Sequence, residues 1–313
     1  MARYRGALPQ IEKGPFLHYV GMDTDLIFTR GIELPGFASY PLLESEKGRA
    51  LLRGYCDRLL DLGRETRVGI ILDTSSWVAN RDRGAAIGFD PEKLRDLNRA
   101  SVDLVARARE AGGDLPTVLC AQMGPRGDGY AAGDRMTVEE AEAYHSEQMQ
   151  TLARSEADFV GGFTLCYPEE AIGMVRAGQR FDMPVAISFT VETDGRLPTG
   201  LPLPEAIQAV DNATNSGAVY FLVNCAHPDH IDKALTAEPW IARLKGVVVN
   251  ASRCSHSELD EAVELDDGDP DELGRLSGRL RQSFPHFTVF GGCCGTDMRH
   301  MRRIAEQVRG SSA

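Results

Sequence analysis

Residues 287–296 read Phe-Thr-Val-Phe-Gly-Gly-Cys-Cys-Gly-Thr and join a short apolar run to two adjacent cysteines, ahead of an amphipathic helix expected to start near Asp297. The glycines allow the backbone to turn tightly and to approach another group closely. Neighbouring cysteines rarely reach the Cα separation that a disulfide needs, so a bond between Cys293 and Cys294 would be strained. Two thiolates presented together suit a soft metal, and zinc is the usual one. The stretch therefore predicts two zinc ligands directly after a buried strand.

Working outward from this stretch, short β-rich runs alternate with helical patterns along the whole chain. The expected strands are 18–22, 68–73, 117–122, 159–164, 185–190, 219–224, 246–250 and 287–291. They are nearly continuously apolar, which is typical of strands buried on both faces of a parallel sheet. Eight is the number of strands that closes a parallel barrel. We therefore expect an α/β fold of the (β/α)8 (TIM) barrel class, with residues 1–313 as a single domain.

The expected helices lie between these strands, at 91–110, 137–155, 168–178, 204–216, 228–235, 270–282 and 297–310. Asp90 is a plausible N-cap with Pro91 at the first helical position, and Thr137 with Glu140 has the spacing of a capping box. The longer connections, 75–90, 124–137, 192–203 and 251–269, all follow strands. In a barrel, such loops cover the carboxyl-terminal face, where active sites are built.

Composition limits the classes of partner. The formal net charge of −12 argues against nucleic acid and is compatible with a cationic small molecule. No apolar run approaches the roughly 20 residues that span a bilayer, so no membrane association is expected. Residues 1–13 lack a signal-peptide core and the seven cysteines are an odd, scattered set, which together favour the cytoplasm. The acidic run 258–269 is expected to be solvated surface, with attraction of a cation as the alternative.

The third zinc ligand is expected to be Cys225, which directly follows the sixth strand as part of Asn224-Cys225. In a barrel, Cys225 and the pair Cys293 and Cys294 would meet at the same rim. Three protein ligands leave one tetrahedral position open, as in catalytic zinc sites. Two alternatives remain: Cys225 could be an inert buried residue at a strand end, and His227 could be a competing ligand.

The other cysteines are given different roles. Cys120 is expected in the strand core and Cys56 in a structural helix, whereas Cys166 and Cys254 follow strands and could line the pocket. The helix from Asp297 would direct its positive N-terminal end at the cysteine pair, which favours thiolate over thiol.

A zinc with three thiolates carries a net negative charge and is poorly suited to making hydroxide, but it binds a fourth sulfur well. Coordination lowers the pKa of a substrate thiol from about 8.5, so that a nucleophilic thiolate exists at neutral pH. A cationic onium methyl donor would be attracted to this centre and would leave as a neutral molecule. Charge is neutralised in the transition state, which a dry barrel mouth favours.

These residues resemble the homocysteine S-methyltransferase family, which includes S-methylmethionine- and betaine-dependent enzymes. The most specific matches are the Gly-Gly-Cys-Cys-Gly-Thr segment at 291–296 and Asn-Cys at 224–225. Supporting segments are 21–26, 74–80, 124–125, 187–190, 194–197 and 250–251, in the same order along nearly the whole chain. The resemblance implies a zinc-bearing (β/α)8 barrel that methylates a thiol, by default homocysteine to give methionine.

The resemblance also implies a substrate pocket, whose expected residues here are Gly21, Met22, Asp23, Trp77, Phe163, Thr164 and Asn250. The family usually has carboxylates that hold the substrate ammonium where this chain has Tyr19 and Phe163, and Asp23 replaces a family glycine. Leaving a buried ammonium unpaired would cost about 2–5 kcal/mol. A different thiol or selenol acceptor is therefore one alternative, with Asp23 either a replacement charge or a surface-loop aspartate. A non-catalytic zinc or redox-sensing protein is the other.

Aromatic residues near the rim suggest a cage for a methylated cation, with ordinary packing as the alternative. The candidates are Tyr19, Trp77, Phe163 and Tyr167. Thr296 is expected to cap or support the last helix, and Asn250 to bond either the substrate or the backbone.

Overall fold

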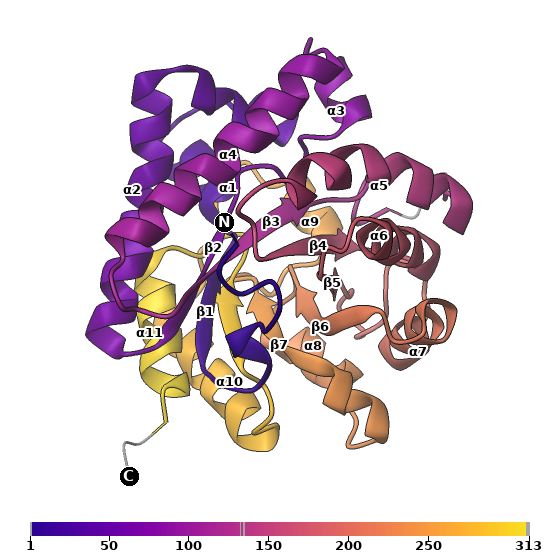
Figure 1. The fold of residues 1–313 in the computed structure, drawn as a ribbon. Helices are drawn as coiled ribbons and strands as arrows, with labels where there is room; N and C mark the ends of the chain where they lie inside the picture. Colours follow the sequence, from indigo (N-terminus) through magenta and orange to yellow (C-terminus); the bar gives the residue numbers. More distant parts are fainter. Residues whose placement is uncertain (1, 132, 134, 311–313) are drawn as a thin grey trace.

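The computed structural model describes residues 2–131, 133 and 135–310; two positions of the predicted 124–137 loop and both ends of the predicted 1–313 domain lie outside them. Within the described residues, eight parallel strands form a closed barrel in chain order (Figure 1). They are β1 (Phe16–Tyr19), β2 (Gly69–Asp73), β3 (Thr117–Met123), β4 (Phe159–Leu165), β5 (Val185–Phe189), β6 (Ala218–Asn224), β7 (Leu244–Val249) and β8 (Val289–Gly292). Pairing of β8 with β1, with Phe290 opposite Leu17, closes the barrel and confirms the predicted fold class.

The first predicted strand is displaced along the chain. It was expected at 18–22, but β1 ends at Tyr19 and a short helix begins at Met22. The turn brings Gly21 so close to the loop after β8 that a Cβ there would lie 2.3 Å from the Cys293 carbonyl oxygen. Only glycine fits at this approach. The strand therefore has to end before the chain passes the cysteine loop.

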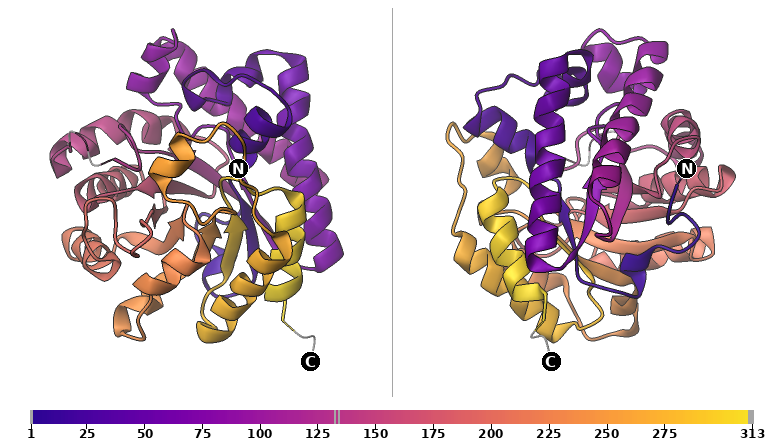
Figure 2. Two further views of the ribbon diagram at one scale, coloured as in Figure 1. Left: turned by 180° about the vertical axis from the view of Figure 1, so that it is seen from behind. Right: turned by 60° about the vertical axis from the view of Figure 1, so that its left-hand side comes forward.

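Helices surround the barrel and separate successive strands (Figure 1). They are α1 (Met22–Thr24), α2 (Glu46–Thr66), α3 (Arg81–Ala86), α4 (Pro91–Ala111), α5 (Val138–Ala153), α6 (Pro168–Arg180), α7 (Leu203–Thr214), α8 (Pro228–Ile231), α9 (His256–Asp260), α10 (Pro270–Ser283) and α11 (Met298–Val308). A π-helical turn, Asp25–Thr29, continues α1, and 3-10 turns occupy Pro9–Ile11, Pro35–Phe37, Tyr40–Glu44, Asp232–Ala234 and Pro239–Arg243. The last helix, α11, packs against α2 and completes the ring (Figure 2).

Two predicted helix starts are confirmed in their capping contacts. The Asp90 side chain accepts a hydrogen bond from the Lys93 N–H at the start of α4. Thr137 and Glu140 form both halves of a capping box at the start of α5. The helix predicted at 228–235 is shorter: α8 ends at Ile231 and a 3-10 turn follows.

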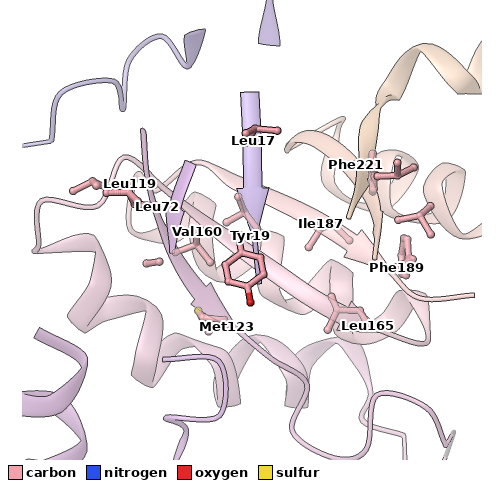
Figure 3. Close-up of a cluster of buried hydrophobic side chains, with 14 of the residues drawn as sticks. Leu17, Tyr19, Leu72, Leu119, Met123, Val160, Leu165, Ile187, Phe189 and Phe221 are labelled. Carbon is pink, nitrogen blue, oxygen red and sulfur yellow. The ribbon is translucent and has the colours of Figure 1, made fainter. Parts of the chain in front are cut away.

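Two apolar layers hold the fold together. The outer layer lies between the strands and the helices, and the side chains of Leu17, Leu119 and Phe221 belong to it (Figure 3). The inner layer fills the barrel and includes Cys225 and Cys293. The sulfur cluster is therefore built on the packed interior of the barrel rather than on mobile surface. Within the described residues, no helix is long and apolar enough to cross a membrane.

Asp158, at the start of the β4 region, is a fully buried carboxylate that joins three parts of the chain. Its Oδ1 accepts hydrogen bonds of 2.7 Å from the N–H groups of Arg3 and Tyr4. Its Oδ2 accepts from the Leu119 N–H and from the Arg109 guanidinium, each at 2.9 Å. Because all these donors are satisfied by one residue, Asp158 attaches the N-terminal segment to the barrel.

Candidate active site

The three predicted sulfur ligands meet at the carboxyl-terminal ends of β6 and β8. Cys225, Cys293 and Cys294 each offer a sulfur, and the three sulfurs lie within 4.8 Å of one another. The Sγ atoms of Cys225 and Cys294 are 3.5 Å apart, so the two residues are not bonded as a disulfide. Sulfurs that share a tetrahedral zinc at about 2.3 Å are separated by about 3.8 Å. The donor set therefore fits zinc in both chemistry and spacing.

Cys225 has a left-handed backbone conformation, with φ of 57°. Such a conformation costs a non-glycine residue of order 1–3 kcal/mol and persists only where the surroundings impose it. Its N–H donates to the Val248 carbonyl at 3.0 Å, and its own carbonyl accepts from His256 Nε2 at 2.7 Å. These bonds on both sides fix the peptide units that direct the Cys225 side chain.

Asn224, the partner of Cys225 in the predicted Asn-Cys pair, connects three strands from a fully buried position. Its Oδ1 accepts from the Thr164 N–H at 3.0 Å and from the Ser188 hydroxyl at 2.7 Å. Its Nδ2 donates to Thr164 Oγ1 at 2.8 Å. Thr164 also has a left-handed φ, of 62°. The amide thus holds the ends of β4, β5 and β6 in the arrangement that presents Cys225.

We expect Asn224→Ala to lower the free energy of unfolding by about 2–4 kcal/mol, because it leaves the buried Thr164 and Ser188 groups unpaired. The affinity for zinc should fall as well, since the Cys225 backbone loses its neighbouring support. Urea denaturation and a competitive zinc titration would measure the two effects. Ser188→Ala removes only one of the bonds and should cost about 1 kcal/mol. Equal losses in the two variants would contradict the role assigned to Asn224.

Two residues that the sequence argument did not select, Tyr130 and His256, lie against the sulfur cluster. The Tyr130 hydroxyl is 2.8 Å from Cys225 Sγ, and its ring lies 4.2 Å from the His256 ring, centroid to centroid. His256 Nδ1 donates to Glu192 Oε1 at 2.9 Å while Nε2 donates to the Cys225 carbonyl. Because both partners of the imidazole are acceptors, both ring nitrogens carry protons. These two contacts favour the protonated form of His256 beside the thiols.

The charges at the site agree with this geometry. Burial lowers the pKa of His256, but the Glu192 carboxylate and the Cys225 carbonyl outweigh it and raise the pKa above its ordinary value. The pKa of Cys225 is well below its usual range because the thiols of Cys293 and Cys294 donate to its sulfur. The pKa values of the Cys293 and Cys294 thiols are raised, and the largest cause is their hydrogen bonding to Cys225. Of the three thiols, Cys225 is therefore the one that ionises most readily.

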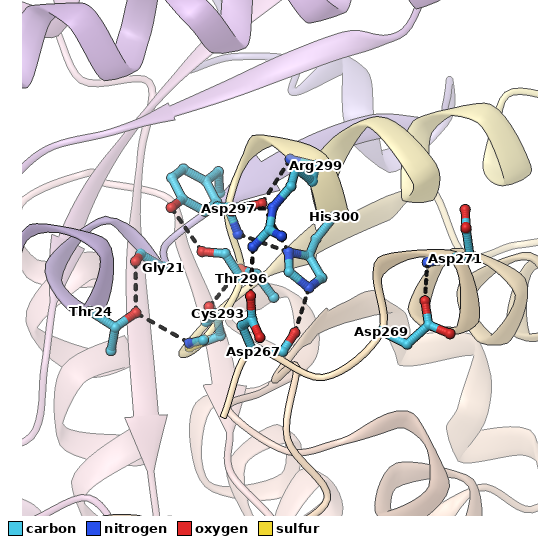
Figure 4. Close-up of polar contacts among 12 residues, drawn as sticks. Gly21, Thr24, Asp267, Asp269, Asp271, Cys293, Thr296, Asp297, Arg299 and His300 are labelled. Atoms are coloured by element: carbon cyan, nitrogen blue, oxygen red, sulfur yellow. Dashed lines mark hydrogen bonds and ion pairs between the residues drawn. The ribbon is translucent and has the colours of Figure 1, made fainter. Parts of the chain in front are cut away.

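The helix after the cysteine pair, α11, is expected to contribute less to the ionisation of the cysteine thiols than the sequence suggested. Asp297 caps α11, and its side chain accepts from the Arg299 N–H at 2.8 Å (Figure 4). The Asp297 carboxylate therefore offsets the positive partial charge at the N-terminus of α11, which was expected to favour thiolates at the cysteine pair. Thr296 is not the cap, although it supports the cysteine loop: its hydroxyl donates to the Cys293 carbonyl at 2.6 Å.

Thr24 holds the loop after β1 against the cysteine loop (Figure 4). Its hydroxyl donates to the Gly21 carbonyl at 2.9 Å and accepts from the Gly295 N–H at 3.2 Å. The segment that contains Asp23 is therefore positioned directly by the segment that contains Cys293 and Cys294.

A cavity of about 500 Å³ opens above the three sulfurs. Aromatic side chains line part of its wall: Phe28, Phe37, Trp77, Tyr130 and Phe163. Acidic side chains surround it at Asp23, Asp128, Asp260, Glu264 and Asp266. The predicted acidic run 258–269 is thus both exposed surface and part of the cavity wall. Apolar faces and negative charge together suit a small organic cation.

The other predicted pocket residues are distributed as follows. Asp23, Trp77, Phe163, Thr164 and Asn250 line the cavity. Met22 lines a smaller neighbouring cavity, and Gly21 forms the close approach to Cys293 rather than a pocket wall. Of the proposed aromatic cage, Trp77 and Phe163 face the cavity. Tyr19 and Tyr167 do not: their hydroxyls bond the Thr296 carbonyl and the Met136 N–H, respectively.

The remaining cysteines and His227 are not among the donors of the sulfur cluster. Cys120 and Cys56 are buried in β3 and α2, as predicted. Neither Cys166 nor Cys254 lines the main cavity among the described residues; Cys166 Sγ points to the Asp128 carbonyl, and Cys254 is exposed. His227 Nδ1 accepts from the Asp229 N–H at 3.2 Å and caps α8, so this nitrogen is engaged in the cap.

Asp23 has an unusual ionisation. Burial raises its pKa from its ordinary value near 4 to about 6, although a hydrogen bond with Ser39 opposes the shift. The folded protein therefore binds a proton at Asp23 more tightly than the unfolded chain does. Stability contributed by this group is lost as the pH rises from about 4 through about 6.

We expect Asp23→Asn to raise the free energy of unfolding by roughly 2–3 kcal/mol above pH 7, since each pKa unit corresponds to about 1.4 kcal/mol. The gain should shrink toward zero below pH 4, where the wild-type carboxyl is protonated in both states. Urea denaturation of both proteins across this pH range would measure it. A gain that is the same at all pH values would show that charge burial is not its cause.

Comparison with known proteins identifies the family of the chain. The family model described as homocysteine S-methyltransferase matches residues 21–308. Homocysteine S-methyltransferase 4 of Zea mays is 27% identical over 269 residues, covering 76% of this chain and 75% of the relative. Homocysteine S-methyltransferase 3 of Arabidopsis thaliana is 26% identical over 263 residues, covering 75% of each.

Solved structures share the fold. The metallated form of the Escherichia coli homocysteine methyltransferase MmuM superposes with a TM-score of 0.72 at 22% identity, covering 96% of this chain and 97% of that one. Its oxidized form gives 0.73 at 22% identity, with 94% and 96% covered. The family match extends over nearly the whole chain, and its range includes Cys225, Cys293 and Cys294. The chain is therefore a methyltransferase and belongs to the homocysteine S-methyltransferase family.

Proposed function

We propose that this protein transfers a methyl group from a small onium donor, such as S-methylmethionine or betaine, to the thiol of homocysteine, giving methionine, with a zinc ion held by Cys225, Cys293 and Cys294. The observation that carries the proposal is the meeting of three cysteine sulfurs at the floor of an acidic, aromatic-lined cavity. Family membership favours this enzyme over the zinc- or redox-sensing alternative.

Cys225, Cys293 and Cys294 would hold the zinc ion, which would lower the pKa of the acceptor thiol so that its sulfur is a thiolate at neutral pH. The protein's own residues do the rest. His256 and Tyr130 hold the Cys225 peptide and thiol in place from one side. Trp77 and Phe163 present apolar ring surfaces that exclude water and suit the methyl groups of a cationic donor.

Asn250 provides a polar contact for the substrates. It directly follows β7, and its Oδ1 is buried without a hydrogen-bond partner among the described residues. A buried acceptor left unpaired costs about 1–3 kcal/mol. A donor from a bound substrate, such as an N–H group, would remove this cost. Asn250 therefore supports the assignment of this cavity to substrate binding.

The direct test is methionine formation by the zinc-loaded protein from homocysteine with S-methylmethionine or betaine. Methionine is expected with at least one onium donor, and Cys293→Ser should abolish it. Cys254→Ser, at an exposed cysteine outside the cluster, should retain it. Absence of methionine with every onium donor from protein that binds one zinc per chain would reject the proposed acceptor and donor class.

A further inference from the structure

Arg83 is a cation in the wall of a cavity whose other charges are mostly negative. It lies in α3, is partly buried, and lines the main cavity together with five acidic side chains. Among the described residues that line this cavity, the only other basic side chain is His256. Both ring nitrogens of His256 are already engaged, one with Glu192 and one with the Cys225 carbonyl. Of these two side chains, Arg83 is therefore the one that can offer its charge to a ligand.

The Arg83 guanidinium has no carboxylate partner among the described residues. Its Nη2 donates to the Gly127 carbonyl at 2.6 Å. A guanidinium has five N–H donors, so most of them remain available for an anion. The neighbouring arginines differ in this respect, because Arg81 and Arg126 both pair with Asp82, at 3.1 and 2.7 Å.

The position of Arg83 relative to the sulfurs is set through Trp77. Arg83 Cζ lies 5.8 Å from the centroid of the Trp77 ring. The indole N–H of Trp77 donates to the Phe163 carbonyl at 3.2 Å. The Phe163 side chain belongs to the inner apolar layer with Cys225 and Cys293. The cavity wall therefore leads from the sulfurs past Phe163 and Trp77 to Arg83, so that one extended small molecule can contact both ends.

The charges of the cavity restrict where each end of such a molecule can lie. An onium group is attracted by the acidic wall, and its methyl groups fit against aromatic rings. A carboxylate on the same molecule would be repelled by that wall except beside a cation. The onium end therefore belongs near the sulfurs, where a methyl group would be transferred, and the carboxylate end belongs at Arg83.

We infer that Arg83 binds the carboxylate of the methyl donor, and that the donor is an onium compound that also has a carboxylate. The inference rests on the proposed function for the identity of the donor. A guanidinium suits this role because it can form two parallel hydrogen bonds to a carboxylate. Arg83 is then a specificity-determining residue: it selects betaine or S-methylmethionine over an onium compound that has no negative charge.

The first test measures binding without methyl transfer. Calorimetric titration of the zinc-loaded wild-type protein compares betaine with betaine amide, and S-methylmethionine with its amide. Each amide has nearly the shape of its parent compound but no carboxylate charge. At least one parent compound is expected to bind about tenfold or more tightly than its amide, because the hydrogen bonds to Arg83 are charge-assisted only with the carboxylate. Failure of both parent compounds to bind, or equal binding within both pairs, would overturn the inference.

The second test uses variants of two arginines in the same helix. Arg83→Gln should weaken binding of the parent compound about tenfold or more and leave binding of its amide unchanged. Arg83→Lys keeps the charge without the planar fork and should retain part of the preference for the carboxylate. Arg81→Gln is the matched control, because Arg81 pairs with Asp82 and does not line the cavity, and it should keep the whole preference. An unchanged preference in Arg83→Gln would overturn the assignment, and the wild-type and Arg83→Lys comparisons stand even if that variant does not fold.

Steady-state kinetics separate the donor from the acceptor, since homocysteine also has a carboxylate. Arg83→Gln should raise KM for the donor about tenfold or more while KM for homocysteine stays the same. A rise confined to homocysteine would overturn the assignment to the donor. If no methionine forms but binding of betaine or S-methylmethionine still depends on Arg83, the proposed function fails and the carboxylate site stands. If methionine forms and Arg83→Gln changes neither KM, the proposed function stands and the carboxylate site fails.

Discussion

Replacing Cys225, Cys293 or Cys294 singly by serine is expected to remove bound zinc and to reduce methyl transfer by at least about 1,000-fold. Each serine replaces a soft, readily ionised thiolate with a hydroxyl that stays protonated at neutral pH and is a poor zinc ligand. The three sulfurs lie within 4.8 Å of one another, and no further cysteine belongs to this cluster among the described residues. A variant with two of the sulfurs therefore has no cysteine in the cluster to replace the lost ligand. Zinc per chain after dialysis, measured by mass spectrometry, and the rate of methionine formation would report the two losses.

Cys254→Ser and Cys56→Ser are the matched controls, because one removes an exposed sulfur and the other a buried sulfur outside the cluster. Both should retain one zinc per chain. Far-UV circular dichroism should show that the three ligand variants remain folded, since these residues lie at the rim above an intact apolar interior. Full zinc content in any ligand variant would remove that residue from the metal site.

Asp158→Ala is expected to lower the free energy of unfolding by about 3–5 kcal/mol, a larger loss of stability than that expected for Asn224→Ala. The substitution removes the buried carboxylate that lies 2.9 Å from the Arg109 guanidinium, which is 3% exposed, and leaves it the half-exposed Glu156 carboxylate at 3.5 Å. Uncompensated buried charges cost this much because the interior cannot replace their hydration. The N–H groups of Arg3, Tyr4 and Leu119 also lose their acceptor. Urea denaturation monitored by fluorescence would measure the loss.

The exposed pair of Arg64 and Asp61 provides the control for charge loss alone. Its atoms are 2.6 Å apart, but the Asp61 side chain is 67% exposed, so Asp61→Ala should change stability by less than about 1 kcal/mol. A double variant, Arg109→Met with Asp158→Leu, should recover part of the loss, because it removes the stranded charge. A small effect of Asp158→Ala would mean that water reaches Arg109 and solvates it.

The alternation of apolar runs with helical patterns was sufficient to predict the barrel, because strands buried on both faces and amphipathic helices leave strong periodic signals. The sequence predicted the ends of individual strands and helices less accurately. The first strand was placed at 18–22 because its apolar pattern continues past Tyr19. Only the contact between Gly21 and the Cys293 carbonyl, residues far apart in the sequence, shows why the chain must turn there.

The roles of Tyr130 and His256 could not be read from the sequence in the same way. Both lie on long loops with no apolar period, and their contacts with Cys225 cross 95 and 31 positions of the chain. One local signal was available for His256: Ser255 and Glu258 form a capping box, which places His256 at the start of a short helix, α9. Nothing local shows that this helix lies over the sulfur cluster.

The sequence by itself determined the fold class and predicted which three sulfurs meet, because strand periodicity and a Gly-Gly-Cys-Cys-Gly segment after a strand are local patterns with few physical interpretations. Only the tertiary structure decided what surrounds those sulfurs. The contact of His256 with the Cys225 carbonyl, the buried position of the Asp23 carboxylate and the cavity at the three sulfurs all depend on how loops from different strands meet once the barrel closes. Such contacts are set by long-range packing and by the cost of burying charge, neither of which leaves a periodic signal in the chain.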